Sequence, residues 1–211
     1  MAQGQSVSSR VITVVLLIGI GLVIFYRWLP TADFPSDIAE EEEVIQQLQI
    51  ASLGILGMSN WEDVKKEALA NKNLKVTDGM IDLGGKGSLF RREVVDSTLD
   101  KPKGVFLLLH GMRFKSQDWL DLGTLHVLAS YGFKMVAIDL PGFGNTPKIK
   151  DLTPVSLLTE VLKSLDMGDA GKVIMVSPSM SGSFSLPFLY AHPERFAGYV
   201  PVAPVGTGNF K

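Results

Sequence analysis

The stretch VIMVSPSMSG, residues 173–182, joins a run of strand-forming residues to three serines at alternate positions. A nucleophile elbow is a sharp strand-to-helix turn with the pattern small-x-Ser-x-small, because its strained backbone brings neighbouring chains close together. Both Ser179 and Ser181 fit this spacing. If the strand is VIMV, the apex falls at Ser179, and Ser177 and Ser181 supply only small bulk. The alternative is a serine-rich turn that caps a helix.

Strand signals recur on both sides of this stretch. The run VFLLLHG, residues 105–111, is continuously apolar, as in strands buried on both faces of a parallel sheet. Two earlier runs, KVTDGMIDL and GSLFRREVVD, flank the turn GGKG and predict a β-hairpin. Two other runs, KMVAIDL and AGYVPVAPV, predict further strands. With the intervening helices, this order predicts an α/β fold with a doubly wound, mostly parallel sheet and right-handed crossovers.

Three helices are expected between these strands, the third directly after the serine turn. The first buries four residues that share one helical face, and it stops at Gly132. These residues are Trp119, Leu122, Leu125 and Leu128. The second is capped by Thr153 and has Pro154 in its first turn. Its buried stripe consists of Leu158, Val161, Leu162 and Leu165.

The segment LLLHGM gives the serine turn a chemical context. Its HG ends a strand two crossovers earlier, where the corresponding loop of an α/β-hydrolase supplies an oxyanion donor. The predicted donors are the backbone N–H groups of Met112 and of Met180, the latter at a helix N-terminus that favours negative charge. His110 is interpreted as a loop-shaping residue and His126 as a surface or packing histidine.

Composition excludes several classes of site. A formal net charge of -2, without a long basic run, gives no reason to expect a nucleic-acid partner. The absence of cysteine excludes disulfides, thiolate metal sites and cysteine catalysis. The segments PGFGNTP and GMIDLGGKGS miss the spacing of dinucleotide and phosphate loops. We therefore predict no metal ligands and no cofactor-binding residues.

The N-terminal region carries an uncharged apolar run, VITVVLLIGIGLVIFY. We expect a tail at 1–10 and an uncleaved transmembrane signal-anchor helix at 11–29, long enough to span when Arg27 snorkels and Trp28 lies at the interface. A cleaved signal peptide and a buried core helix are the alternatives. Weak charge asymmetry favours a single-pass type II arrangement with the globular part non-cytosolic, the cytoplasmic face being the alternative.

The following segment, 30–73, contains an acidic run, in contrast to the uncharged stretch before it. Its acidic residues after Asp37 suit the first turn of a helix, so a juxtamembrane helical linker is expected, with a second helical segment around Trp61 to Ala70. A solvated spacer is the commoner meaning of such an acidic run. The remainder, 74–211, is expected to form a partial α/β-hydrolase domain, incomplete at its C-terminus.

Several motifs together resemble the alpha/beta hydrolase domain-containing protein 14 family. They are HGMRF, WLDLGTLHVLA, MVAIDLPGFGN, SPSMSG, SLPFL and GYVPVAP. The N-terminal anchor resembles the membrane-bound A form, and HGMRF resembles the soluble B form. The resemblance implies an α/β-hydrolase fold with Ser179 as nucleophile. It also implies hydrolysis of small acyl esters or transfer of short acyl groups, with coenzyme A as an acceptor in the B form.

The chain departs from the family at the acid and the base. In this fold the order is Ser, acid, His, yet after Met180 only His192 and Glu194 are candidates. Thirteen helical residues would put His192 roughly 20 Å from Ser179, so we predict neither base nor acid within this chain. A shortened, inactive form of a membrane-anchored serine hydrolase is favoured. A non-catalytic binding or regulatory protein and a minimal enzyme with another base are the alternatives.

Overall fold

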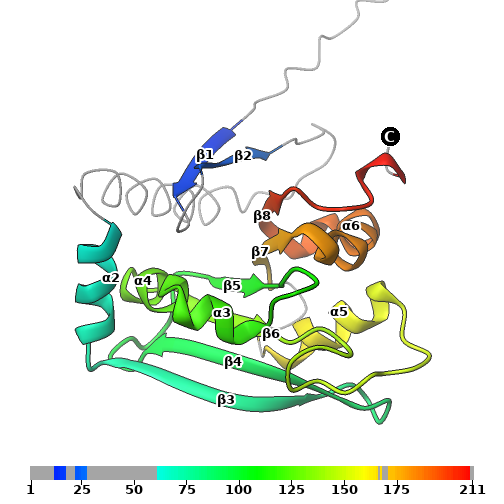
Figure 1. The fold of residues 1–211 in the computed structure, drawn as a ribbon, viewed down its shortest axis with the longest axis horizontal. Helices are drawn as coiled ribbons and strands as arrows, with labels where there is room; N and C mark the ends of the chain where they lie inside the picture. The colour runs from blue at the N-terminus through cyan, green and yellow to red at the C-terminus, as the bar shows by residue number, and fades with distance from the viewer. Residues whose placement is uncertain (1–11, 18–21, 28–60, 166, 168–170, 210–211) are drawn as a thin grey trace, which may run out of the picture.

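A six-stranded mixed sheet is the centre of the molecule (Figure 1). The computed structural model describes residues 12–17, 22–27, 61–165, 167 and 171–209. The strand order is β3-β4-β6-β5-β7-β8, with antiparallel pairing between β3 and β4 and between β4 and β6, and parallel pairing elsewhere. The strands are β3 (Leu74–Asp82), β4 (Ser88–Asp96), β5 (Val105–Leu108), β6 (Lys134–Ile138), β7 (Val173–Pro178) and β8 (Phe196–Val202).

Helices cover both faces of this sheet. They are α2 (Trp61–Ala70), α3 (Ser116–Asp121), α4 (Thr124–Ser130), α5 (Pro154–Ser164) and α6 (Gly182–Ala191). Short 3₁₀ turns are η1 (Ser179–Ser181), η2 (Pro193–Arg195) and η3 (Thr207–Asn209). The predicted hairpin is confirmed as β3 and β4, and the predicted mostly parallel sheet is confirmed in the pairing of β5 through β8.

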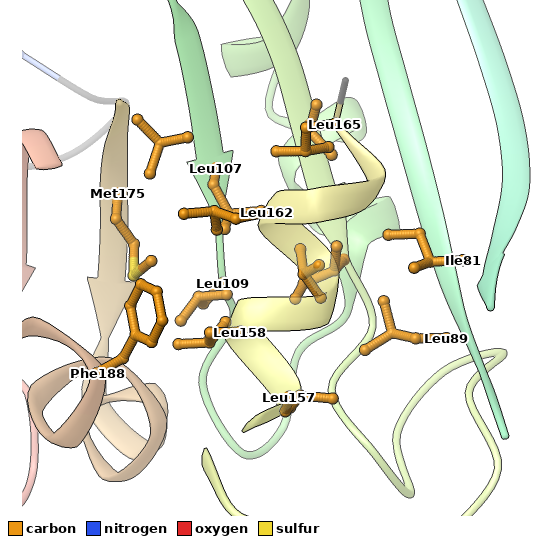
Figure 2. Close-up of a cluster of buried hydrophobic side chains, with 14 of the residues drawn as sticks. Ile81, Leu89, Leu107, Leu109, Leu157, Leu158, Leu162, Leu165, Met175 and Phe188 are labelled. Carbon is orange, nitrogen blue, oxygen red and sulfur yellow. The ribbon is translucent and has the colours of Figure 1, made fainter. Parts of the chain in front are cut away.

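Successive residues of β5 point to opposite faces, which divides the core into two layers. Phe106 and Leu108 pack with Leu125 and Leu128 of α4. The alternate residue Leu107 belongs to the other layer. There it joins the apolar stripe of α5, with Met175 and Phe188 on one side and the hairpin residues Ile81 and Leu89 on the other (Figure 2). Both faces of β5 are therefore buried, as its unbroken apolar run predicts.

Local signals account for the start and orientation of α5. The Thr153 side chain accepts a hydrogen bond from the backbone N–H of Ser156 at 3.1 Å, and Pro154 is the first helical residue. The predicted stripe is confirmed, because each of its members is at most 3% exposed: Leu158, Val161, Leu162 and Leu165.

The helix predicted through Trp119 and Leu128 is two helices, α3 and α4. Gly123 separates them with a φ of 83°, a left-handed conformation that ends one helix and changes the direction of the next. Leu122 consequently leaves the shared face and is 43% exposed, whereas Leu128 is buried. Gly132, with a φ of 93°, follows α4 as the expected stop.

The helix expected around residues 61–70 is present as α2. It buries Val64 and Ala68 against Val127 of α4, so it packs directly onto the globular part. The acidic segment after Asp37, where another helix is expected, lies outside the described residues.

The expected transmembrane helix at 11–29 is not what the structure shows. Strands β1 (Ile12–Leu17) and β2 (Leu22–Arg27) pair antiparallel within that segment. β-Branched and aromatic residues together dominate both runs and glycines occur between them, which favours a hairpin over a helix. Among the described residues, no helix is long and apolar enough to cross a bilayer. Membrane association of this chain stays a prediction from its sequence.

Leu122 and Leu128, on either side of the break at Gly123, provide a direct test of the division into α3 and α4. Leu128→Ala should lower the free energy of unfolding by about 2–4 kcal/mol, because it leaves a cavity in the core. The matched change Leu122→Ala should alter it by no more than about 0.5 kcal/mol. Urea titration followed by circular dichroism measures both; equal losses would restore the single-helix interpretation.

Candidate active site

Ser179 occupies the apex of a sharp turn between β7 and α6. Its φ is 49°, a left-handed conformation that is uncommon outside glycine and costs backbone energy. The Ser179 side chain is exposed, whereas Ser177 and Ser181 are fully buried. Of the three serines in the motif, only Ser179 is therefore presented to solvent at the turn.

Gly182 allows a second chain segment to approach this turn closely. A Cβ atom at this position would lie 2.4 Å from the Val205 carbonyl oxygen and 2.7 Å from Pro204 Cβ. Just beside this contact, the backbone N–H of Val205 donates to the Ser179 carbonyl at 2.9 Å. The segment after β8 is thus fastened to the apex.

A chain of hydroxyl groups lies beneath the turn, and the sequence analysis missed it. Ser177 Oγ is 3.1 Å from Ser181 Oγ and 2.6 Å from Ser185 Oγ, and Ser185 Oγ is 2.8 Å from the Tyr199 hydroxyl. Ser181 Oγ also donates to the Pro178 carbonyl at 2.7 Å. The four-residue spacing of Ser177, Ser181 and Ser185 was the available signal, but Tyr199 comes from β8 and is brought in only by folding.

The end of β5 lies directly beside Ser179. The N–H of Leu109 donates to the Val176 carbonyl at 2.9 Å, which extends the pairing of β5 with β7. A Cβ atom built on Gly111 would lie 3.7 Å from Ser179 Cβ. The sheet reverses its order between β5 and β7, and ligands of open α/β sheets bind at such switch points.

The two backbone groups predicted as oxyanion donors follow these contacting residues. Met112 comes directly after Gly111, and Met180 comes directly after Ser179. The Met180 N–H belongs to the first turn after β7, where amides lack acceptors within the helix. Met112 has a 64% exposed side chain, so its role at this site would be carried by its backbone.

His110 is committed to shaping the loop. Its Nε2 accepts from the Leu140 N–H at 2.9 Å, so the proton is on Nδ1, which donates to the Gly111 carbonyl at 2.8 Å. Burial lowers the pKa of His110, opposed by its bond to the Gly111 carbonyl. With both ring nitrogens engaged by backbone, this imidazole is not available to Ser179.

The other two histidines lie elsewhere. His192 ends α6, at the opposite end from Ser179, and its Nδ1 is 3.2 Å from Glu194 Oε1. His126 is in the middle of α4, and burial lowers its pKa. Among the described residues, none hydrogen-bonds the Ser179 hydroxyl. No histidine of this chain is therefore held against Ser179 as a general base would be.

The glycine-containing loop after β6 has a structural explanation. Buried Asp139 accepts from the Ser116 N–H at 2.6 Å and from the Asn145 N–H at 2.8 Å. A Cβ atom on Gly144 would lie 2.1 Å from Asp139 Oδ2, so this position requires glycine. Within the described residues, no group of three or more potential ligands could hold a metal ion.

Strain at the apex predicts an unusual order of stability. Ser179→Gly should be about 1 kcal/mol more stable than Ser179→Ala, because glycine adopts a φ of 49° without a steric penalty. The neighbouring helical position gives the control, since Ser183→Gly should be less stable than Ser183→Ala by up to about 1 kcal/mol. Chemical denaturation of the four variants decides; the same order at both positions would contradict the strained turn.

The buried state of His110 predicts a pH dependence. Its folded pKa lies below the ordinary value of 6.5, so the unfolded chain binds more protons as the pH falls. Stability should be complete above about pH 6.5 and should decline from there toward the lower folded pKa. His110→Gln should remove the part of this decline that is due to His110, whereas His126→Gln should remove only its own part, because burial lowers the pKa of both histidines; denaturation between about pH 5 and pH 7.5 compares each variant with the wild type.

Comparison with known proteins agrees with this geometry. The alpha/beta hydrolase family matches residues 106–210. The chain is 43% identical over 141 residues to ABHD14B of Rattus norvegicus, a candidate protein-lysine deacylase by name, covering 64% of this chain and 65% of that protein. It is 43% identical over 143 residues to protein ABHD14A of Danio rerio, covering 64% and 51% respectively. The chain thus spans about half to two thirds of these curated relatives.

Solved structures agree on the fold. A predicted CIB-like hydrolase from Thermoplasma acidophilum has a TM-score of 0.57 at 21% identity, covering 65% of this chain and 67% of that one. A 2-hydroxy-6-oxo-6-phenylhexa-2,4-dienoate hydrolase from Rhodococcus has a TM-score of 0.50 at 22% identity, covering 63% and 48%. The chain therefore belongs to the alpha/beta hydrolase family, as a relative of the ABHD14A and ABHD14B proteins.

Proposed function

We propose that this chain carries the nucleophile side of a serine-hydrolase site, with Ser179 as the residue that accepts an acyl group. The observation that carries the proposal is the exposed Ser179 at a left-handed apex after β7, with the two flanking serines buried. A turn of this kind presents the hydroxyl above the sheet, where a substrate carbonyl can reach it.

The backbone N–H groups of Met112 and Met180 would stabilise the tetrahedral intermediate. Support comes from the contact between Gly111 and Ser179, which sets the two loops side by side. Such donors are fixed before the reaction, so they stabilise the developing oxyanion without reorganisation. Removing one donor in a serine protease costs about 10²- to 10³-fold in rate.

Small acyl groups on an ester or on a lysine side chain are the substrates that we propose. The ABHD14B relatives are named for protein-lysine deacylation, and the family resemblance implies hydrolysis or transfer of short acyl groups. Coenzyme A as an acyl acceptor follows from the resemblance alone.

The leaving group decides what this chain can do by itself. A nitrophenolate leaves without a proton, whereas an amine released from an acyl-lysine must be protonated by a general acid. Because the three histidines are placed elsewhere, we propose that Ser179 accepts an acyl group from an activated ester but does not cleave an acyl-lysine amide. In this step the Ser179 oxygen bonds to the acyl carbon, the bond from that carbon to the nitrophenyl oxygen breaks, and the Ser179 proton passes to solvent water.

The positions of the histidines also favour a second function, acyl-ligand binding without turnover. In that case an acyl compound would occupy the loops around Ser179 and no covalent product would form. Detection of an acyl group on Ser179 separates the two proposals, because binding alone leaves the mass of the chain unchanged.

Mass spectrometry after incubation with a short-chain nitrophenyl ester tests this function. We expect slow acylation at Ser179, abolished in Ser179→Ala and retained in Ser183→Ala, an exposed serine in the first turn of the adjacent α6. Steady hydrolysis should stay near the residual rate, about 10³- to 10⁴-fold above water, that remains when a triad member is removed. Acylation of Ser179→Ala at the wild-type rate would exclude Ser179 as the nucleophile.

An acetyl-lysine peptide gives the complementary prediction. The chain should release no free lysine peptide above background, because the amine leaving group receives no proton. Liquid chromatography of the reaction measures this. Rapid, Ser179-dependent release would show that another group of the chain serves as acid and base.

A further inference from the structure

We infer that β8 and the segment after it position the reacting groups, by fixing the two peptide planes that flank Ser179. Tyr199 acts on one plane through the hydroxyl chain, and the Val205 N–H acts on the other. Both are positioning residues and do not themselves touch substrate. The inference rests on the proposed role of Ser179, although the geometry that it describes can be tested separately.

The first plane joins Pro178 to Ser179. Because the peptide bond is planar, the direction of the Pro178 carbonyl fixes the direction of the Ser179 N–H. Ser181 Oγ donates to that carbonyl at 2.7 Å and so holds the plane on one side of the strained φ. The bond is made by a fully buried side chain, which has no water to exchange with.

The number of protons available fixes which hydroxyl donates and which accepts at each step of the hydroxyl chain. Each hydroxyl has a single proton, and Ser181 spends its proton on the Pro178 carbonyl, which can only accept. Ser177 must then donate to Ser181, Ser185 must donate to Ser177, and Tyr199 must donate to Ser185. Tyr199 is therefore the terminal donor of a chain that crosses from β8 to the peptide before Ser179.

The second plane joins Ser179 to Met180. The Val205 N–H donates to the Ser179 carbonyl at 2.9 Å. In a trans peptide the N–H points opposite to the C=O, so this bond also sets the direction of the Met180 N–H, the proposed oxyanion donor. One hydrogen bond from the segment after β8 thus orients a group that would act on the substrate.

The segment that carries Val205 is itself held in an uncommon conformation. Ala203 has a φ of 46° between β8 and Val205, and Gly182 is required for the close approach of Pro204 and Val205. A strained backbone persists only where its surroundings determine it strongly. Ala203 and Ser179, two of the three left-handed non-glycine residues among those described, therefore support each other across this contact.

Three variants of the full chain test the inference. Ser181→Ala removes the bond to Pro178, and Tyr199→Phe removes only the terminal hydroxyl, with the ring retained. Ser183→Ala is the matched control, since Ser183 Oγ also bonds a carbonyl three residues earlier, that of Met180, but lies outside the hydroxyl chain. We measure hydrogen exchange in the peptides that contain Val205 and in those that contain β5. A second measurement gives the rate constant and the inhibitor affinity for labelling of Ser179 by a fluorophosphonate.

In Ser181→Ala we expect the exchange of the Val205 amide to rise about fivefold, the factor for one neutral hydrogen bond, while the β5 amides stay unchanged. The maximal labelling rate should fall by a similar factor with unchanged inhibitor affinity. Tyr199→Phe should show both effects more weakly, and it carries the test if Ser181→Ala does not fold.

Two results would overturn the inference. The first is that the Val205 amide exchanges in Ser181→Ala and in Tyr199→Phe at the same rate as in Ser183→Ala. The other is a uniform rise across all peptides, which would mean global destabilisation. Failure of wild-type Ser179 to react with fluorophosphonate would instead refute the proposed nucleophile, and hydrogen exchange would still decide whether the two planes are fixed.

Discussion

The left-handed turn at Ser179 is the constraint on which the surrounding structure depends. A serine with a φ of 49° is held there by its neighbours and not by its own preference. Ser177 and Ser181 are small enough to be buried beneath it, and Gly182 admits the segment around Val205. The turn is thus specified by small residues at three positions, by the bond from the Ser181 hydroxyl to the Pro178 carbonyl, and by the bond from the Val205 N–H, in the segment after β8, to the Ser179 carbonyl.

The adjacency of β5 and β7 places a second loop beside that turn. Their parallel pairing brings two loops together at one edge of the sheet, so that Gly111 lies beside Ser179. His110 fixes the first loop, because its two nitrogens bind the backbone of Gly111 and Leu140, on loops that follow β5 and β6. Burial lowers the pKa of this imidazole and so favours the neutral form, which its accepting nitrogen requires. His110 therefore has the loop-shaping role that the sequence predicts.

Local signals in the sequence were sufficient for some elements and not for others. The Thr153 cap and the apolar stripe of α5 act within a few residues, so the helix could be predicted. At Gly123 the helical pattern continues through a left-handed break that periodicity does not register. In residues 11–29 the apolar run is compatible with helix or hairpin; its length and the flanking Arg27 and Trp28 favoured a spanning helix, which the structure does not show. Tyr199 could not be paired with Ser185 because their contact depends on the packing of β8 beside β7.

Charge stabilisation and proton transfer are separate tasks at this site. In the proposed site the first task would use backbone amides of loops that β5 and β7 hold together, and it would require no titrating side chain. The second requires a base within hydrogen-bond reach of Ser179, and His110, His126 and His192 are each committed elsewhere. An acyl donor whose leaving group departs as an anion requires only the loss of the Ser179 proton, which water can accept slowly, whereas an amide also requires a proton for the departing amine. The leaving group therefore decides whether the Ser179 turn is sufficient for the proposed acyl transfer or whether a positioned imidazole is also required.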